Sequence, residues 1–476
     1  MNIHKTYLQC LFFLIIILTA CGFSLAKQTN PTSKNLNFGK FLNSIYEWRI
    51  QQQKNFGDSN NNNLKIGTPT VLAGIFCFIA ASISSAGGIG GGGLYVPILI
   101  IVAGVDLKTA SSFSAFMVTG SSIANVVCSM FLPSAKHGGK ILVDFDIALL
   151  SQPCILLGVS IGVVCNLVFP EWLITILFAI FLAWCTFKTF RSGIYYWKIE
   201  SEEVMRRKEN FEEIEGPLLE KEEKGIKNIP WMKMAVLIMI WFTFLFLYLL
   251  RGNRHGQGII HMKACGVVYW IISSVQFPVA IIFTSWILYK RENHQNLPKQ
   301  EITCETKNNG PSRMFIFPLM ALLAGVLGGV FGIGGGMLIS PLLIQVGITP
   351  EVILYYSSIF VNSFNFRISI YFILNYTATC SFMVFFSSTM SAVQYLFLGM
   401  EHVNTALIFA IVCLIASLIG LVVVQRAIEH HGRASLIVFS VGIVMALSTV
   451  LLTSFGAVDV WRDYTSGKYM GFKPPC

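Results

Sequence analysis

Long apolar segments recur along most of this chain, and they limit the possible folds more than any other feature. Stretches long enough to cross or half-cross a bilayer lie near 70–86, 94–104, 111–131, 146–169, 171–190, 231–250, 265–289, 315–331, 337–347, 378–399, 404–424 and 434–455. Charged residues make up 12% of the chain, about half of the ~25% usual in soluble domains. In hydrocarbon only helices satisfy the backbone within one segment. The sequence therefore predicts an all-α polytopic membrane protein with about ten transmembrane helices.

The remaining stretches indicate how the chain is organised. Residues 1–26 have the basic start, the apolar run and the small-x-small site of a signal peptide, with an uncleaved anchor as the alternative. Residues 27–67 form a polar lumenal or extracellular arm. We further expect a first transmembrane repeat at 68–190, a charged loop at 191–230, two linking transmembrane helices at 231–289, a polar loop at 290–314, a second transmembrane repeat at 315–455 and a tail at 456–476.

Two glycine clusters carry the evidence for an internal repeat. Residues 87–97 read GGIGGGGLYVP and residues 329–341 read GVFGIGGGMLISP. At an offset of 244 four glycines, one isoleucine, one leucine and one proline coincide. Later, Phe116-Met117-Val118 matches Phe382-Met383-Val384 at an offset of 266. Gly162 and Gly420 occupy matching points of the next helix. Two repeats with broken helices near the membrane midplane are a common plan for transporters.

The change of offset means that the second half carries 22 extra residues, and they fall within 353–376. This stretch lacks Gly, Ala, Pro, Asp, Glu and Lys and uses residues encoded largely by AT-rich codons. Our hypothesis is an inserted or mis-spliced segment that derives from a retained intron. The alternative is an additional helix. Sequencing the mature transcript across this region decides between them, and continuous coding reads would contradict the hypothesis.

The glycine clusters are the strongest candidate for a ligand site. Glycine lets a helix break and brings backbone amides close to a ligand, and a helix that begins after the break directs free N–H groups and its positive dipole end at an anion. The predicted binding glycines are Gly88, Gly90, Gly91, Gly92, Gly332, Gly334, Gly335 and Gly336. Close helix packing is the competing interpretation. Membrane flanks argue against a dinucleotide fold, and no lysine follows either cluster as a P-loop requires.

Hydroxyl side chains near the clusters could contact the same anion. Ser121 and Ser122 match Ser387 and Ser388 at the offset of 266, and we expect these four serines to line the site. Taken singly, a helical serine more often bonds back to its own helix. The Ser151-Gln152-Pro153 tripeptide and Gln394 place polar side chains within two other apolar segments.

No catalytic constellation is visible, so we expect no enzyme activity, no cofactor and no metal site. Asp144 and Asp146 are predicted to start a helix in an ordinary capping role. The expected partners are a small anionic substrate and the lipid bilayer, and not nucleic acid, because positive loop charge orients membrane proteins. A homo-oligomer is left open.

The quoted glycine motifs, together with CSFMVFFSSTMSAVQYL and PCILLGVSIGVVCNLVFPEWLITILF, resemble the plant branch of the sulfite exporter TauE/SafE family over roughly residues 68–455. The resemblance implies a multi-pass permease with two repeats that moves sulfite, sulfonates or related small anions. It maps the family's glycine motifs onto 87–93 and 332–336. The segment at 353–376 departs from the family pattern.

Taken together, the sequence predicts a permease for a small sulfur oxyanion or sulfonate that works by alternating access between the two repeats. The alternative is a multi-pass membrane scaffold or receptor that recruits partners through its charged loops, above all 191–230. The signal peptide predicts the secretory pathway, at the plasma membrane or an endomembrane.

Overall fold

The structure is a computed structural model that describes residues 68–85, 90–131, 143–210, 231–251, 267–295, 311–334, 364–400, 402–431, 435–465, 467 and 471–472. The chain divides into two compact units. Residues 68–73 and 99–105 belong to the first, and residues 74–98 and everything described from 106 onward belong to the second. All contacts discussed below lie within the second unit.

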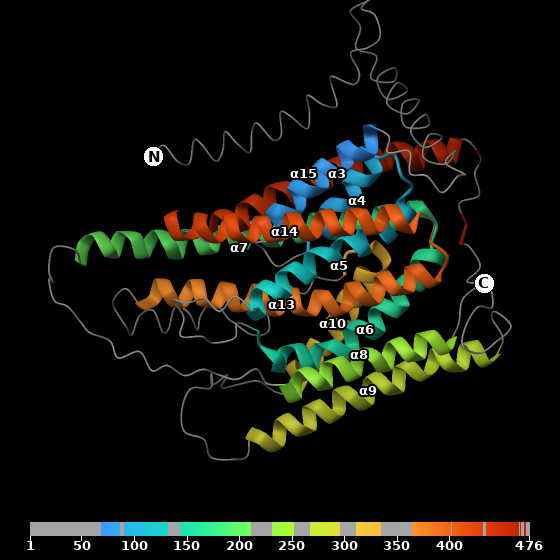
Figure 1. Cartoon of the computed structure of the whole chain (residues 1–476), viewed down its shortest axis with the longest axis horizontal. Helices are drawn as coiled ribbons and strands as arrows, with labels where there is room; N and C mark the ends of the chain where they lie inside the picture. Colours follow the sequence, from blue (N-terminus) through green and yellow to red (C-terminus); the bar gives the residue numbers. More distant parts are fainter. Residues whose placement is uncertain are drawn as a thin grey trace, which may run out of the picture. The chain divides into compact units, whose positions relative to one another are not determined.

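Every regular element of the described residues is a helix, and no strand occurs among them. The helices are α3 Thr68–Ser85, α4 Gly92–Ile101, α5 Leu107–Phe131, α6 Phe145–Val168, α7 Glu171–Asn210, α8 Trp231–Arg251, α9 Val267–Gln295, α10 Pro311–Phe331, α13 Phe364–Phe397, α14 Val403–His431 and α15 Ser435–Thr465 (Figure 1). Eight of these helices are long and apolar enough to cross a membrane. The described part of the chain thus has the polytopic, all-helical character that the sequence predicts.

Some boundaries differ from expectation. Helix α7 continues to Asn210, so residues 191–210 are helical and not part of a loop. The physical reason is composition: after Gly193 this stretch has no glycine or proline, and it is rich in the strong helix formers Glu, Lys and Arg. Helix α15 likewise extends into the expected tail, to Thr465. The signal peptide and the polar arm at 27–67 lie outside the described residues.

The stretch at 353–376 is described only from residue 364, where it forms the first turns of α13. Helix α13 therefore has 34 residues, against 25 in α5. This helical extension does not test the origin of the segment, and its derivation from a retained intron stays a prediction.

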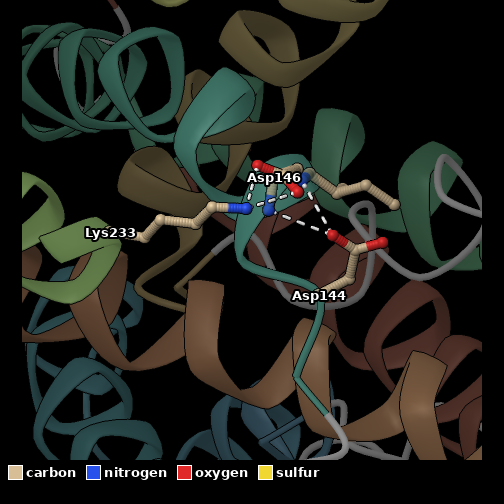
Figure 2. Close-up of polar contacts among 4 residues, drawn as sticks. Asp144, Asp146 and Lys233 are labelled. Atoms are coloured by element: carbon tan, nitrogen blue, oxygen red, sulfur yellow. Dashed lines mark hydrogen bonds and ion pairs between the residues drawn. The ribbon is translucent and has the colours of Figure 1, made fainter. Parts of the chain in front are cut away.

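Two acidic side chains stand at the start of α6, where Asp144 caps the helix as predicted while Asp146 instead forms an ion pair with Lys233 (Figure 2). The Asp144 carboxylate accepts hydrogen bonds from the backbone N–H of Asp146 and Ile147, at 3.0 and 3.3 Å, and so caps the helix. Lys233 of α8 bonds both carboxylate oxygens of Asp146, at 2.6 and 2.7 Å. This ion pair ties α8 to the beginning of α6 at a solvent-exposed point.

The helices pack across the two halves of the sequence. Helix α6 contacts α10 and α13 of the second half, α14 of the second half contacts α5 of the first, and α7 pairs with α15. Helices α8 and α9 contact each other and α6. The two expected repeats are therefore interleaved and do not form separate bundles.

Glycines make the tightest of these contacts. Gly158 and Gly162 of α6 face Gly325 and Gly329 of α10, and a Cβ added at Gly162 would lie 2.1 Å from the Val326 carbonyl oxygen. In the other half, a Cβ at Gly420 of α14 would lie 2.2 Å from the carbonyl oxygen of Ser82 in α3. At these crossings small residues allow the two backbones to touch.

Candidate anion site

The first glycine cluster breaks the chain between α3 and α4. Gly90 and Gly91 adopt φ values of +76° and +78°, which side-chain-bearing residues rarely adopt. Helix α4 then begins at Gly92 and has only 10 residues, as expected for a half-helix. The N–H groups of Leu94 and Tyr95 donate to the Gly91 carbonyl, at 2.9 and 3.2 Å. The N–H groups before them, at Gly92 and Gly93, have no preceding carbonyl within the helix.

The second glycine cluster follows the end of α10 at Phe331. Gly332 and Gly334 have φ values of +66° and +65°. Gly90 and Gly334, which the offset of 244 pairs, thus share a left-handed backbone conformation. Three of the predicted glycines, Gly88, Gly335 and Gly336, and the expected half-helix at 337–347 lie outside the described residues.

The structure brings the two glycine breaks into contact. A Cβ at Gly92 would lie 2.7 Å from the Cα of Ile333, which stands between Gly332 and Gly334. A Cβ at Gly90 would lie 3.0 Å from a methyl of Val118 in α5 and 3.2 Å from a methyl of Val384 in α13. Val118 and Val384 are themselves matched at the offset of 266. The breaks therefore meet each other between α5 and α13.

Matched serines also meet at this crossing. The hydroxyls of Ser122 and Ser388 lie 3.5 Å apart, and both side chains are buried. A neighbouring bond of 3.3 Å joins the Asn125 amide of α5 to the Ser381 hydroxyl of α13. Because sequence numbers rise along α5 while they fall along α13 at these contacts, the two helices cross in opposite directions.

The other two predicted serines each face one glycine break. The Ser121 hydroxyl lies 2.9 Å from the hydroxyl of Tyr95, in the first turn of α4. The Ser387 hydroxyl donates to the backbone carbonyl of Gly334. All four serines are buried. The structure thus gathers the four serines and the described glycines into one region.

Most of these hydroxyls already donate a hydrogen bond. Ser122 donates to the Thr119 carbonyl at 2.9 Å and Ser388 to the Phe385 carbonyl at 3.3 Å, the back-bonding that is common for helical serines. Their oxygens remain acceptors, and a hydroxyl can rotate its hydrogen toward a ligand. Donors directed at an anion would otherwise come from the backbone at the start of α4.

Two residues near these serines were missed in the sequence. Asn125 lies one turn beyond Ser121 on α5 and exchanges hydrogen bonds with Ser85 at the end of α3. Its spacing from Ser121 and Ser122 was the available signal, since residues three and four apart share a helix face. Tyr95 lies two residues after the first glycine run, and its ring covers Gly91.

The region is neutral as well as buried. Among the described residues, the buried side chains that can hydrogen-bond through oxygen or nitrogen are Ser, Thr, Asn, Gln and Tyr, and Asp, Glu, Lys, Arg and His are absent from the buried set. Burial of a charged ligand among uncharged groups is favourable only when hydrogen bonds replace its lost water. The arrangement can therefore hold a small anion through dipoles and donors, with no ion pair.

Known proteins are similar to this sequence. The profile of the family described as "Sulfite exporter TauE/SafE" matches residues 2–208. The chain is 57% identical to sulfite exporter TauE/SafE family protein 2 of Arabidopsis thaliana over 88% of this chain and 90% of the relative. The chain is also 50% identical to sulfite exporter TauE/SafE family protein 5 of the same plant, over 98% of this chain and 99% of the relative. No solved structure matches the chain. The chain belongs to the sulfite exporter TauE/SafE family.

Proposed function

We propose that this protein is a membrane permease for a small sulfur oxyanion or sulfonate, and that the two glycine breaks form its binding site. The observation that carries the proposal is the contact of the two breaks between α5 and α13, beside four buried serines. Paired broken helices at a repeat interface are the usual place for a transporter's substrate. Membership of a family named for sulfite export agrees with this choice of substrate.

The packing suggests which parts move in alternating access. Gly420 and Gly120 join α14 closely to α3 and α5, while the α6 glycines join α6 closely to α10. Such backbone contacts leave no space for sliding. We therefore assign α3–α5–α14 to one moving body and α6–α10 to the other, each built from both halves of the sequence, in place of the two repeats themselves.

Flux of labelled sulfite into proteoliposomes that contain the full chain tests the proposal, with sulfate and taurine as competitors. We expect saturable uptake that one competitor reduces. A matched preparation without residues 353–376 shows whether that segment affects uptake. Flux no greater than in empty vesicles, from both proteins in a folded state, would contradict the permease function.

The compartment follows from the same proposal. We place the protein in a membrane of the secretory pathway, on the basis of the signal-like sequence at 1–26. Fluorescent tagging of the C-terminus with organelle markers checks this placement.

A further inference from the structure

Helix α6 carries an amide side chain that the contacts above leave unexplained. Gln152 is fully buried, and neither its Nε2 nor its Oε1 has a hydrogen-bond partner among the residues that the structure describes. Its neighbour Ser151, in contrast, donates to α6 carbonyls and lies 3.7 Å from the sulfur of Met383 in α13. Gln152 is thus a free donor and a free acceptor inside a helix bundle.

Contacts on either side place Gln152 along α13. The Asp144 N–H donates to the Thr379 hydroxyl at 2.8 Å near one end, and Gln394 donates to the Ser160 hydroxyl at 2.9 Å near the other. The two helices therefore run in the same direction, and Gln152 falls at the level of the intervening part of α13. That part contains Ser387, Ser388 and Ser391.

Further unpartnered atoms occur along the same contact. The hydroxyl of Ser391 and the Oε1 of Gln394 are buried without a partner. A buried polar group with no partner destabilises a protein by about 1–3 kcal/mol. At the position that the Gly162–Gly420 match pairs with Gln152, α14 has Ala410, so helix packing alone does not require an amide. A ligand that pairs with the amide would explain why it is there.

We propose that Gln152 is a specificity-determining residue of the permease site and that it selects a singly charged oxyanion which carries a hydrogen, such as hydrogen sulfite. This inference rests on the function proposed above. An amide pairs its N–H with an anion's oxygen and its carbonyl with an anion's hydrogen. Sulfate at neutral pH offers only acceptors and would leave the carbonyl unpaired.

Charge supports the same selection. The described buried side chains include no cation to neutralise a ligand. The free energy needed to remove an ion from water rises steeply with its charge, and an unpaired buried charge is costly. A dianion such as sulfate therefore binds less favourably here than a monoanion for two reasons: it leaves the Gln152 carbonyl unpaired, and its removal from water costs more free energy. Sulfite changes between these forms near neutral pH, so its uptake should depend on pH.

The test compares Gln152→Met with Gln276→Met in the full chain. Gln276 of α9 is also buried and has an unpartnered Nε2, but it lies outside the proposed site, which makes it the matched control. Each protein is assayed for thermal stability and for sulfite uptake into proteoliposomes at equal internal and external pH, mildly acidic and mildly alkaline. Sulfite uptake by the wild type should be faster at mildly acidic pH than at mildly alkaline pH, and sulfate should inhibit it only weakly.

We expect both variants to keep or raise the melting temperature, because Gln152→Met removes two unpaired buried polar atoms and Gln276→Met removes one. Only Gln152→Met should lower sulfite uptake, by about tenfold for the loss of one charge-assisted hydrogen bond, and sulfate should then compete more effectively. Gln152→Glu, which replaces the donor with an acceptor, should abolish uptake.

Three results would overturn the inference. One is unchanged uptake and unchanged pH dependence in Gln152→Met. Another is a lower melting temperature in that variant with normal uptake per folded molecule, which would mean a structural water or partner for the amide. If wild type transports no anion at all, the permease function fails and this inference fails with it. Wild-type transport together with an unaffected variant refutes the role of Gln152 alone.

Discussion

Two helix crossings in this protein are built from small residues, yet they differ in kind. At the α6–α10 crossing the glycines are helical and abut a facing backbone, as Gly162 does at the Val326 carbonyl. At the α5–α13 crossing the glycines have left-handed φ values, and buried serines surround them. The first arrangement explains close packing. In the second arrangement the glycines interrupt the chain between helices and the serines supply buried polar groups, and close packing requires neither feature.

The comparison separates two interpretations that the sequence alone leaves open. Substitution at the first crossing should disturb stability alone, whereas substitution at the second should also disturb transport in any variant that still folds.

Gly332→Ala should have the largest effect. A Cβ there would lie 1.7 Å from the Ser111 carbonyl oxygen, and φ is +66°. We expect the free energy of unfolding to fall by more than about 4 kcal/mol, which is exceptional for one substitution. Little monodisperse protein should therefore be recovered in detergent. Gly467→Ala is the control, because its φ is +67° and nothing lies within 4 Å. Normal yields of Gly332→Ala would contradict this geometry.

Gly162→Ala and Gly420→Ala should be destabilised by similar amounts, about 1–3 kcal/mol each, since an added methyl overpacks each crossing. Thermal unfolding in detergent measures both. Gly74→Ala is the helical control, because its nearest neighbour would be Phe409 at 3.9 Å. Strongly unequal losses at Gly162 and Gly420 would count against the predicted repeat, which pairs them.

Gly90→Ala should combine a modest loss of stability with a large loss of transport. The left-handed conformation is disfavoured by about 1–2 kcal/mol for alanine, and the facing valine methyls can shift slightly. Because the methyl enters the meeting point of the two breaks, sulfite uptake per folded molecule should fall at least tenfold. Gly399→Ala, with φ +81° and open space around it, carries the same strain and should transport normally. Equal uptake by the two variants would remove Gly90 from the site.

The Ser122–Ser388 contact should give the smallest effect. At 3.5 Å between oxygens the direct bond is weak. A double-mutant cycle with both alanine variants should therefore show a coupling of about 0.5 kcal/mol in sulfite binding. Strict additivity would mean that the two serines do not act on one ligand.

Much of this fold follows from the sequence because hydrocarbon allows so few structures. The long apolar segments are helices in the structure, the glycine run interrupts the chain before α4, and Asp144 caps α6, all as the sequence predicts. Each of these depends on local chemistry within a few residues. The matched serines at the offset of 266 also indicated residues that meet in space, as Ser122 and Ser388 do.

The partners of each helix could not be predicted in the same way. An apolar segment surrounded by lipid has no strong preferred face, so hydropathy does not say that α6 packs against α10. A signal was nevertheless present, since Gly158–Gly162 and Gly325–Gly329 both have the GxxxG spacing. The unpaired amide of Gln152 needed the structure, because only burial and the positions of its neighbours reveal that it lacks a partner.

The interleaving of helices also sets an order of events during synthesis. Gly162 emerges from the ribosome 163 residues before Gly325, from the difference of their positions. At common elongation rates of about 5–20 residues per second, α6 waits roughly 10–30 s for α10. During that interval its glycine face is exposed to lipid or covered by another protein. A membrane chaperone that recognises small-residue faces would meet this chain during that interval.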